Sequence, residues 1–199
     1  MTISTGDQLP QATLLRIGDN GRPEAVALDD LTKGRKVIVF GLPGAFTPTC
    51  SSAHLPSFIR TRAQFTDKGV DEIICVSVND PFVMAAWAQA SGADEGGVTL
   101  LADPASEFTT AIGMNFDFPP SGFHGRSIRY ALLVEDGVGG VTQQGAAGAR
   151  LGGRRLHFGP RLQECIDQSG EAPADRSLAS AHKADQGDPA AGRPGDRTA

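Results

Sequence analysis

The stretch from Lys36 to Ser51 constrains the fold of this chain more than any other part of its sequence. It opens with the β-branched and aromatic run Lys36-Val37-Ile38-Val39-Phe40-Gly41. Such a run predicts a strand that is buried on both faces. Thr47-Pro48 follows a short way on; threonine is a favoured N-cap, and proline suits the first helical position. We therefore predict a strand, a tight turn and a helix in immediate succession.

The turn places one cysteine, Cys50, in the first turn of that helix. Backbone N–H groups without helical partners and the positive end of the helix dipole lie at this point. Both favour the thiolate over the thiol. A lone cysteine is more commonly a buried, inert thiol, but the specific turn chemistry around Cys50 favours a nucleophile.

Composition limits the classes of function that need to be considered. The chain has 199 residues, of which 40% are hydrophobic, and its net charge is −5. That is enough for one globular core, and the interspersed charges argue against nucleic-acid or anionic-membrane partners. No stretch is long and apolar enough to span a bilayer. The first residues lack a secretory signal pattern, so we expect a cytoplasmic location.

The three cysteines, Cys50, Cys75 and Cys165, are far apart in the sequence. In a protein that stays inside the cell, this spacing does not indicate a disulfide framework. No CxxC pair and no zinc-ligand spacing of Cys and His occurs, so we expect no metal and no bound cofactor. Cys75 lies within the apolar run Ile74-Cys75-Val76 and is predicted to be an inert core thiol.

Up to about residue 140, apolar runs alternate with helical patterns. This alternation predicts an α/β fold with a mixed central β-sheet flanked by helices on both faces. Helices are expected from Thr47 to Lys68, after Asp80, and from Asp103 to Ala111, and a loop is expected at residues 122–126. Strands are expected at residues 12–17, 36–41, 73–78, 98–101 and 129–134.

Several segments resemble one known family, in that family's order. They match the peroxiredoxin 5 (type II) subfamily of peroxiredoxins over roughly residues 3 to 138. The most specific is Pro43-Gly44-Ala45-Phe46-Thr47-Pro48-Thr49-Cys50-Ser51 with His54-Leu55-Pro56. Further segments are Ser77-Val78-Asn79-Asp80-Pro81-Phe82-Val83-Met84 with Trp87, and Arg126-Ser127-Ile128-Arg129-Tyr130.

The resemblance implies a thioredoxin-like fold, a homodimer, and thiol peroxidase activity on hydrogen peroxide and organic hydroperoxides. It places the peroxidatic cysteine at Cys50, the active-site threonine at Thr47, the loop proline at Pro43 and the active-site arginine at Arg129. The Arg129 guanidinium stays protonated and can hold both sulfur and oxygen. Thr47 is expected to accept an amide hydrogen bond as the N-cap while its hydroxyl proton donates to sulfur or peroxide. Pro43 stiffens the loop.

The chain departs from the family after about residue 140. Residues 1–140 are predicted to form the thioredoxin-like domain, and residues 141–199, rich in Gly, Ala and Arg, an atypical and largely disordered segment. We interpret the abrupt change as a shifted reading frame or a replaced terminus. No motif identifies Cys165, within this segment, as a partner of Cys50.

The reductant of oxidised Cys50 is left open between glutathione, with or without glutaredoxin, and thioredoxin. A one-cysteine cycle with glutathione is the simplest interpretation. Two other classes of function are considered: a redox sensor that passes its oxidation to a partner protein, and an inactive thioredoxin-fold binding module. A hydrolase-like Cys50–His54 pair is conceivable, but no orienting Asn or Asp is evident, so His54 is expected to pack or cap.

Overall fold

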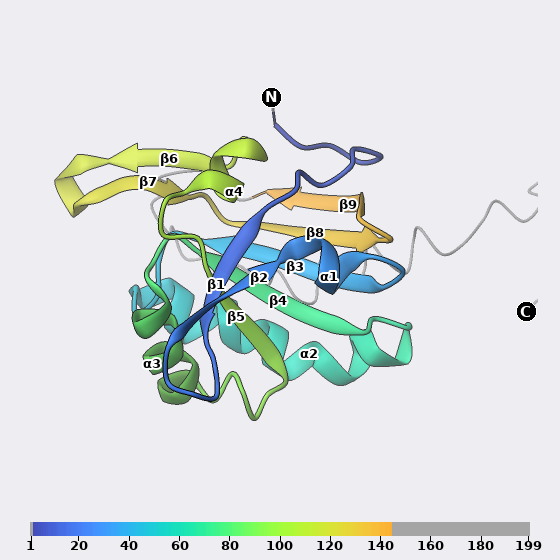
Figure 1. Cartoon of the computed structure of the whole chain (residues 1–199), viewed down its shortest axis with the longest axis horizontal. Helices are drawn as coiled ribbons and strands as arrows, with labels where there is room; N and C mark the ends of the chain where they lie inside the picture. Colours follow the sequence, from blue (N-terminus) through green and yellow to red (C-terminus); the bar gives the residue numbers. More distant parts are fainter. Residues whose placement is uncertain (1, 145–199) are drawn as a thin grey trace, which may run out of the picture.

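The computed structural model describes residues 2–144, and Figure 1 shows them as a mixed sheet with helices on both sides. The main sheet has seven strands in the order β2-β1-β5-β4-β3-β8-β9. These strands are β1 (Thr13–Ile17), β2 (Pro23–Ala27), β3 (Lys36–Leu42), β4 (Glu72–Ser77), β5 (Val98–Ala102), β8 (Tyr130–Glu135) and β9 (Val138–Gln144). The predicted fold class, a mixed central sheet with flanking helices, is confirmed.

The centre of the sheet is parallel and its margins are antiparallel. Strands β3, β4 and β5 run parallel, whereas β1, β8 and their outer neighbours run antiparallel to the strands beside them. The carboxyl ends of β3 and β4 therefore meet at one edge, where Leu42 pairs with Ser77. The loop that follows β3 leads from this edge to Cys50.

Two layers of helix cover the two faces of the sheet. Helices α2 (Leu55–Asp67) and α3 (Pro81–Ser91) pack against one face through a cluster that includes Phe58 and Trp87. Helices α1 (Leu28–Thr32) and α4 (Glu107–Ala111) cover the other face, with Leu28 and Phe108 buried. Central strands that are buried on both faces explain the continuous apolar runs in their sequences.

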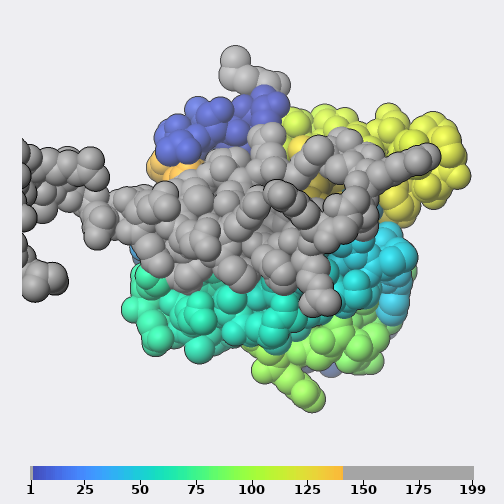
Figure 2. Space-filling model, turned by 180° about the vertical axis from the view of Figure 1, so that it is seen from behind, coloured from blue at the N-terminus to red at the C-terminus, as the bar shows by residue number. Residues whose placement is uncertain are grey.

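A separate hairpin extends from the side of the sheet. It consists of β6 (Asn115–Phe118) and β7 (Phe123–Ser127), joined through the short 3-10 helix η2 (Pro119–Ser121). Seen from behind in Figure 2, this hairpin is the yellow lobe beside the helical layers. The prediction of a loop at residues 122–126 is therefore wrong. Most of this segment forms the strand β7, which pairs with β6 and is held by an edge-on contact of Phe116 with Phe123.

Two further features differ from the sequence-based expectations. The short strand β2 and helix α1 were not predicted, because segments this short and partly exposed carry little periodicity. Strand β9 continues to Gln144 and so crosses the domain boundary placed at residue 140. The rest of the segment predicted to be disordered, including Cys165, lies outside the described residues.

Candidate active site

The pairing of β3 with β8 brings Arg129 to the loop that carries Cys50. Gly41, near the end of β3, pairs with Tyr130, the first residue of β8. A Cβ at Gly41 would lie 2.1 Å from Tyr130 Cε1, so only glycine allows the ring to pack there. Arg129 immediately precedes this pair and therefore lies beside the loop that follows Leu42.

Cys50 lies in a widened helical turn rather than in a regular α-helix. The helix begins at Pro48, as predicted, and a π-turn, η1 (Cys50–His54), follows before α2. The N–H of Leu55 donates to the carbonyl of Cys50, which is the i+5 bond of a π-turn. Single π-turns within α-helices are frequent at functional sites. The Cys50 side chain is fully buried in this structure.

Arg129 is the charged side chain in direct contact with the cysteine. Its Nη2 donates to Cys50 Sγ at 3.7 Å. Its Nε is buried and has no hydrogen-bond partner among the described residues. A fixed cation beside sulfur stabilises the thiolate, and an unused donor beside the nucleophile can hold an oxygen on which charge develops.

Thr47 and Pro43 shape the loop between β3 and the helix. Thr47 accepts the first helical hydrogen bond at its carbonyl, from Ser51 N at 3.0 Å, so it occupies the N-cap position that the sequence predicts. Its hydroxyl, however, donates to the carbonyl of Gly44 at 2.9 Å instead of accepting an amide N–H. Because this bond uses the hydroxyl proton, Oγ1 keeps lone pairs that can accept a hydrogen bond from a ligand. Pro43 is buried directly after β3.

Two residues that the sequence analysis did not assign to the site anchor this loop. Asn79 Oδ1 accepts from the N–H of Ala45 at 3.0 Å, and Arg126 Nη1 donates to the carbonyl of Pro43 at 3.4 Å. Both belong to segments that matched the family pattern, but their partners are distant in sequence. That match was the one signal that singled them out.

A buried tryptophan supports the residue next to the cysteine. Trp87 of α3 is the single tryptophan of the chain. Its Nε1 donates to Ser51 Oγ at 3.0 Å. The bond joins α3 to the first turn of the helix that carries Cys50, and it satisfies an indole donor that would otherwise be buried without a partner.

His54 is part of an aromatic cluster rather than a base for Cys50. Its ring centroid lies 5.4 Å from that of Phe40 and 5.7 Å from that of Phe58. Burial, assisted by the nearby Arg129 charge, lowers the pKa of His54 to about 3. The imidazole is therefore neutral and a very weak base at neutral pH. This agrees with the packing role expected from the sequence.

Cys75 lies in the core on the same side of the sheet as Cys50. It is fully buried in β4, and this burial, with a smaller contribution from Cys50, raises the pKa of its thiol well above the usual value. A thiol held in its protonated form is a poor nucleophile. The structure therefore supports the inert role predicted for Cys75.

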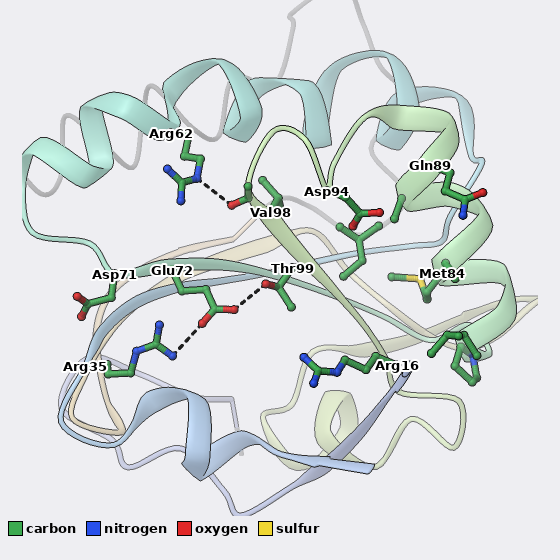
Figure 3. A pocket seen from close by; sticks show the side chains of 16 residues that line it. Arg16, Arg35, Arg62, Asp71, Glu72, Met84, Gln89, Asp94, Val98 and Thr99 are labelled. Atoms are coloured by element: carbon green, nitrogen blue, oxygen red, sulfur yellow. Dashed lines mark hydrogen bonds and ion pairs between the residues drawn. The ribbon is translucent and has the colours of Figure 1, made fainter. Parts of the chain in front are cut away.

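A separate cleft of about 640 Å³ lies at the opposite, amino ends of the parallel strands. Figure 3 shows Arg16, Arg35 and Arg62 around it, together with acidic side chains from β4 and its flank. Cys50, Thr47, Pro43 and Arg129 are not among the residues that line it. Within residues 2–144, no helix has the length and apolar character needed to cross a membrane.

An α/β fold with one cysteine at a helix start, in contact with a partly buried arginine, is typical of a thioredoxin-like redox protein. Comparison with known proteins narrows this class. The family model described as Redoxin matches residues 4–148. Peroxiredoxin-2E-2, chloroplastic, from Oryza sativa subsp. japonica is 48% identical over 151 residues, which are 74% of this chain and 67% of that protein. Peroxiredoxin-2B from Arabidopsis thaliana is 44% identical over 134 residues, 67% of this chain and 82% of that protein.

Solved structures agree with these relatives. The crystal structure of reduced Prx3 from Vibrio vulnificus in complex with hydrogen peroxide superposes with a TM-score of 0.71. It shares 40% identity and covers 81% of this chain and 99% of that one. The chain therefore belongs to the redoxin family and, within the thioredoxin-like superfamily, to the peroxiredoxins. It is a thiol peroxidase.

Proposed function

We propose that this peroxidase reduces hydrogen peroxide and organic hydroperoxides with Cys50 as the nucleophile. An electron pair on the Cys50 thiolate forms an S–O bond to the terminal oxygen of the peroxide, and the O–O bond breaks. Sulfur is oxidised to a sulfenic acid, the peroxide is reduced, and the departing hydroxide or alkoxide takes a proton from solvent to give water or an alcohol.

The contact of Arg129 Nη2 with Cys50 Sγ, at 3.7 Å, is the observation that carries this proposal. The same guanidinium retains a buried donor, Nε, that has no partner among the described residues. A rigid cation can therefore act on sulfur in the ground state and on the peroxide oxygens in the transition state. Donors that act mainly on the transition state accelerate the reaction.

Thr47 completes the donor and acceptor set around the peroxide. Because its proton is held by the Gly44 carbonyl, its oxygen can accept the O–H of a bound hydroperoxide. Pro43 closes the loop on the side of β3 and offers no N–H to water or substrate. The three residues thus orient the peroxide for in-line attack by sulfur.

The proposal includes a one-cysteine cycle without a bound cofactor. Glutathione, with or without glutaredoxin, reduces the sulfenic acid of Cys50, and thioredoxin is the second choice. The protonated, buried state of the Cys75 thiol supports this cycle. The proposal also includes the cytoplasmic location expected from the sequence, which cell fractionation tests.

Steady-state peroxide consumption with each donor system tests the proposal. The assay compares the full chain with Cys50→Ser, Cys75→Ser and Cys165→Ser variants. We expect Cys50→Ser to abolish turnover and the other two variants to retain it with glutathione. Loss of turnover in Cys75→Ser or Cys165→Ser contradicts the one-cysteine cycle. Slow turnover combined with a mixed disulfide to a partner protein indicates a sensor instead.

We propose in addition that two copies of the chain pair near the site. Phe46 and Phe82 are both more than half exposed, and Ala45, next to Phe46, is bonded to Asn79, close before Phe82 in sequence. Aromatic side chains are enriched in protein–protein interfaces relative to the rest of the surface. Sedimentation of the full chain tests this: we expect a dimer that Phe46→Ser and Phe82→Ser weaken, and a monomer at all concentrations contradicts it.

A further inference from the structure

One side-chain oxygen ties together three parts of the chain around the active-site loop. Asn79 Oδ1 accepts hydrogen bonds from Ala45 N at 3.0 Å, Ser77 Oγ at 2.8 Å and Arg126 Nη1 at 3.2 Å. These donors belong to the loop after β3, the end of β4, and β7. Because one donor is a cation, this junction is stronger than a set of neutral bonds.

Gly44 allows the guanidinium of Arg126 to lie directly on the backbone of this loop. A Cβ at Gly44 would lie 2.8 Å from Arg126 Nη1, which is closer than real Cβ contacts come. The same nitrogen donates to the Pro43 carbonyl at 3.4 Å. On its other side, the guanidinium carbon lies 5.6 Å from the centroid of the Phe123 ring. Arg126 is thus held between the loop and an aromatic ring.

The loop in turn directs the hydroxyl of Thr47. The Gly44 carbonyl accepts from Thr47 Oγ1 at 2.9 Å and from Thr47 N at 3.4 Å. Between them, Phe46 has a φ of +59°, in the left-handed region. Such a conformation costs on the order of 1–3 kcal/mol and persists only where its surroundings hold it. The bonds of Asn79 and Arg126 to the preceding residues supply that support.

We propose that Asn79 and Arg126 are positioning residues for peroxide reduction. They hold the Gly44 carbonyl in the place where it orients the Thr47 hydroxyl, at the start of the helix that carries Cys50. Neither residue is assigned a contact with the peroxide, so both act through the loop. This inference rests on the proposed function, because it concerns the same reaction at Cys50.

The first test separates the shape of Arg126 from its charge. Arg126→Lys keeps the charge and loses the planar fork that bonds Pro43 and Asn79, whereas Arg126→Met loses both. Since a misplacement of about 1 Å can cost about 10²-fold in rate, we expect both variants to lower the rate of Cys50 oxidation by roughly 10- to 100-fold. Arg126→Lys should leave the alkylation rate of Cys50 unchanged, because alkylation reports the thiolate and not peroxide placement. Arg60→Met, at an exposed arginine of α2, is the matched control and should change neither rate.

The second test uses Gly44→Ala, which displaces the Arg126 guanidinium without altering any charge. We expect it to slow oxidation strongly in the wild-type background and much less in the Arg126→Met background. Equal losses in both backgrounds, or a full oxidation rate in Arg126→Lys, overturn the inference. Thermal melts of all variants confirm folding. A wild-type chain that leaves peroxide untouched contradicts the proposed function instead, so the two failures are distinct.

Discussion

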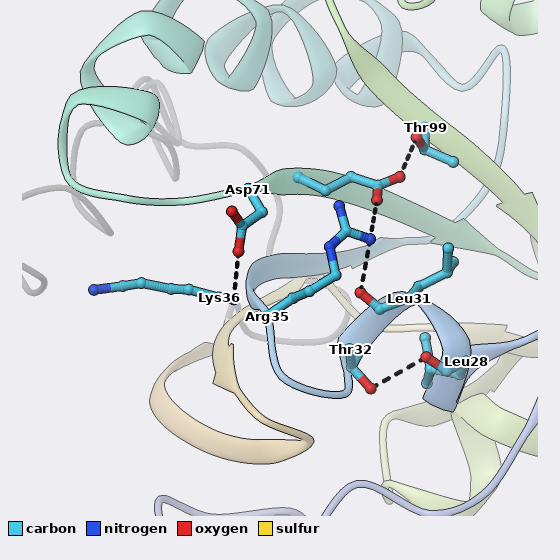
Figure 4. A network of polar contacts seen from close by, with 8 residues as sticks. Leu28, Leu31, Thr32, Arg35, Lys36, Asp71 and Thr99 are labelled. Carbon is cyan, nitrogen blue, oxygen red and sulfur yellow. Dashed lines mark hydrogen bonds and ion pairs between the residues drawn. The ribbon is translucent and has the colours of Figure 1, made fainter.

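Charged side chains gather at both ends of the central parallel strands, and their hydrogen bonds differ. At the amino ends, Arg35 Nη1 donates to Glu72 Oε2 at 2.8 Å and to the Leu31 carbonyl at 3.0 Å. Glu72 also accepts from Thr99 Oγ1 at 2.6 Å, and Figure 4 shows Arg35, Leu31 and Thr99 in this network. At the carboxyl ends, Arg129 reaches Cys50 Sγ at 3.7 Å and keeps a buried donor without a partner among the described residues.

The difference separates a structural network from a reactive one. Both oxygens of Glu72 are occupied by groups of the chain itself, so that network joins α1, β4 and β5 and leaves little capacity for a ligand. Buried donors are nearly always satisfied in folded proteins. The buried Arg129 Nε without a partner among the described residues therefore lowers the stability of the fold. Its place beside Cys50 explains why it is kept, because a peroxide oxygen can accept its hydrogen bond.

The largest expected effect comes from removing the unused donor. Arg129→Met should lower kcat/KM for hydrogen peroxide by about 10²- to 10³-fold, the usual loss for one transition-state donor. Arg129→Lys should recover only part of this, because a point charge cannot hold sulfur and oxygen together. Peroxide consumption under steady-state conditions measures both. If Arg129→Met keeps kcat/KM within a factor of about two of wild type, the arginine at the carboxyl ends of the strands is as structural as the Glu72 network at the amino ends.

The second prediction concerns His54, which is buried beside Phe40 and Phe58 in its uncharged form. Its pKa is lowered to about 3 in the folded protein from 6.5, so the unfolded state binds more protons between these values. Stability must then decrease as the pH falls below 6.5, by about 2 kcal/mol between pH 7 and pH 5. His54→Phe keeps a ring against Phe40 and Phe58 and lacks this titration.

Urea unfolding of wild type and His54→Phe across this pH range measures the effect. The difference in unfolding free energy between the two proteins should be constant above about pH 6.5 and shift in favour of the variant below it. A difference that stays constant down to pH 5 shows that His54 is not kept neutral by burial.

The amino-end network should affect stability without affecting the reaction. Glu72→Gln keeps an acceptor for Thr99 and removes the charge that faces Arg35. We expect a loss of about 1 kcal/mol in unfolding free energy, because this pair is only partly shielded from solvent, with kcat/KM unchanged. Chemical denaturation and the peroxidase assay on the same sample give both values. A fall in kcat/KM at unchanged stability would show that the two ends communicate.

The smallest effect is expected at the ion pair between Lys36 and Glu135 on the sheet surface. Their charged atoms are 3.0 Å apart, but the Glu135 side chain is 60% exposed. Exposed pairs of this kind contribute roughly 0–1 kcal/mol. Lys36→Met should therefore change the unfolding free energy by about 0.5 kcal/mol or less. A loss in unfolding free energy larger than that of Glu72→Gln would show that this exposed ion pair stabilises the sheet more than the Glu72 network does.

Local chemistry made part of the site predictable from the sequence. The run around Thr47 and Pro48 predicted the helix start and the place of Cys50 correctly. A helix was predicted to follow Asp80, and the structure shows Asp80 as its N-cap, accepting from Val83 N at 2.9 Å. Such features depend on residues a few positions apart, and these are the distances over which capping and turn preferences act.

Contacts between distant segments could not be predicted in this way. The partners of Asn79 and Arg126 follow from the order and register of β3, β4 and β7, which no local pattern specifies. The π-turn at Cys50 was missed because a run of helix-compatible residues does not distinguish i+4 from i+5 bonding. The strand β7 was predicted as a loop because Gly125 within it and Gly122 before it are typical of loops, whereas its strand pairing is provided by β6.

The oxidation of Cys50 by peroxide tests the account most directly. Wild type and Arg129→Met are mixed with hydrogen peroxide in the absence of a reductant, and the loss of one thiol is followed with Cys50→Ser as the blank. We predict that wild type loses the Cys50 thiol rapidly, and that Arg129→Met, which lacks the donor at 3.7 Å from Cys50 Sγ, loses it about 10²-fold more slowly. Equal rates of thiol loss in the two proteins would contradict the pairing of Cys50 with Arg129.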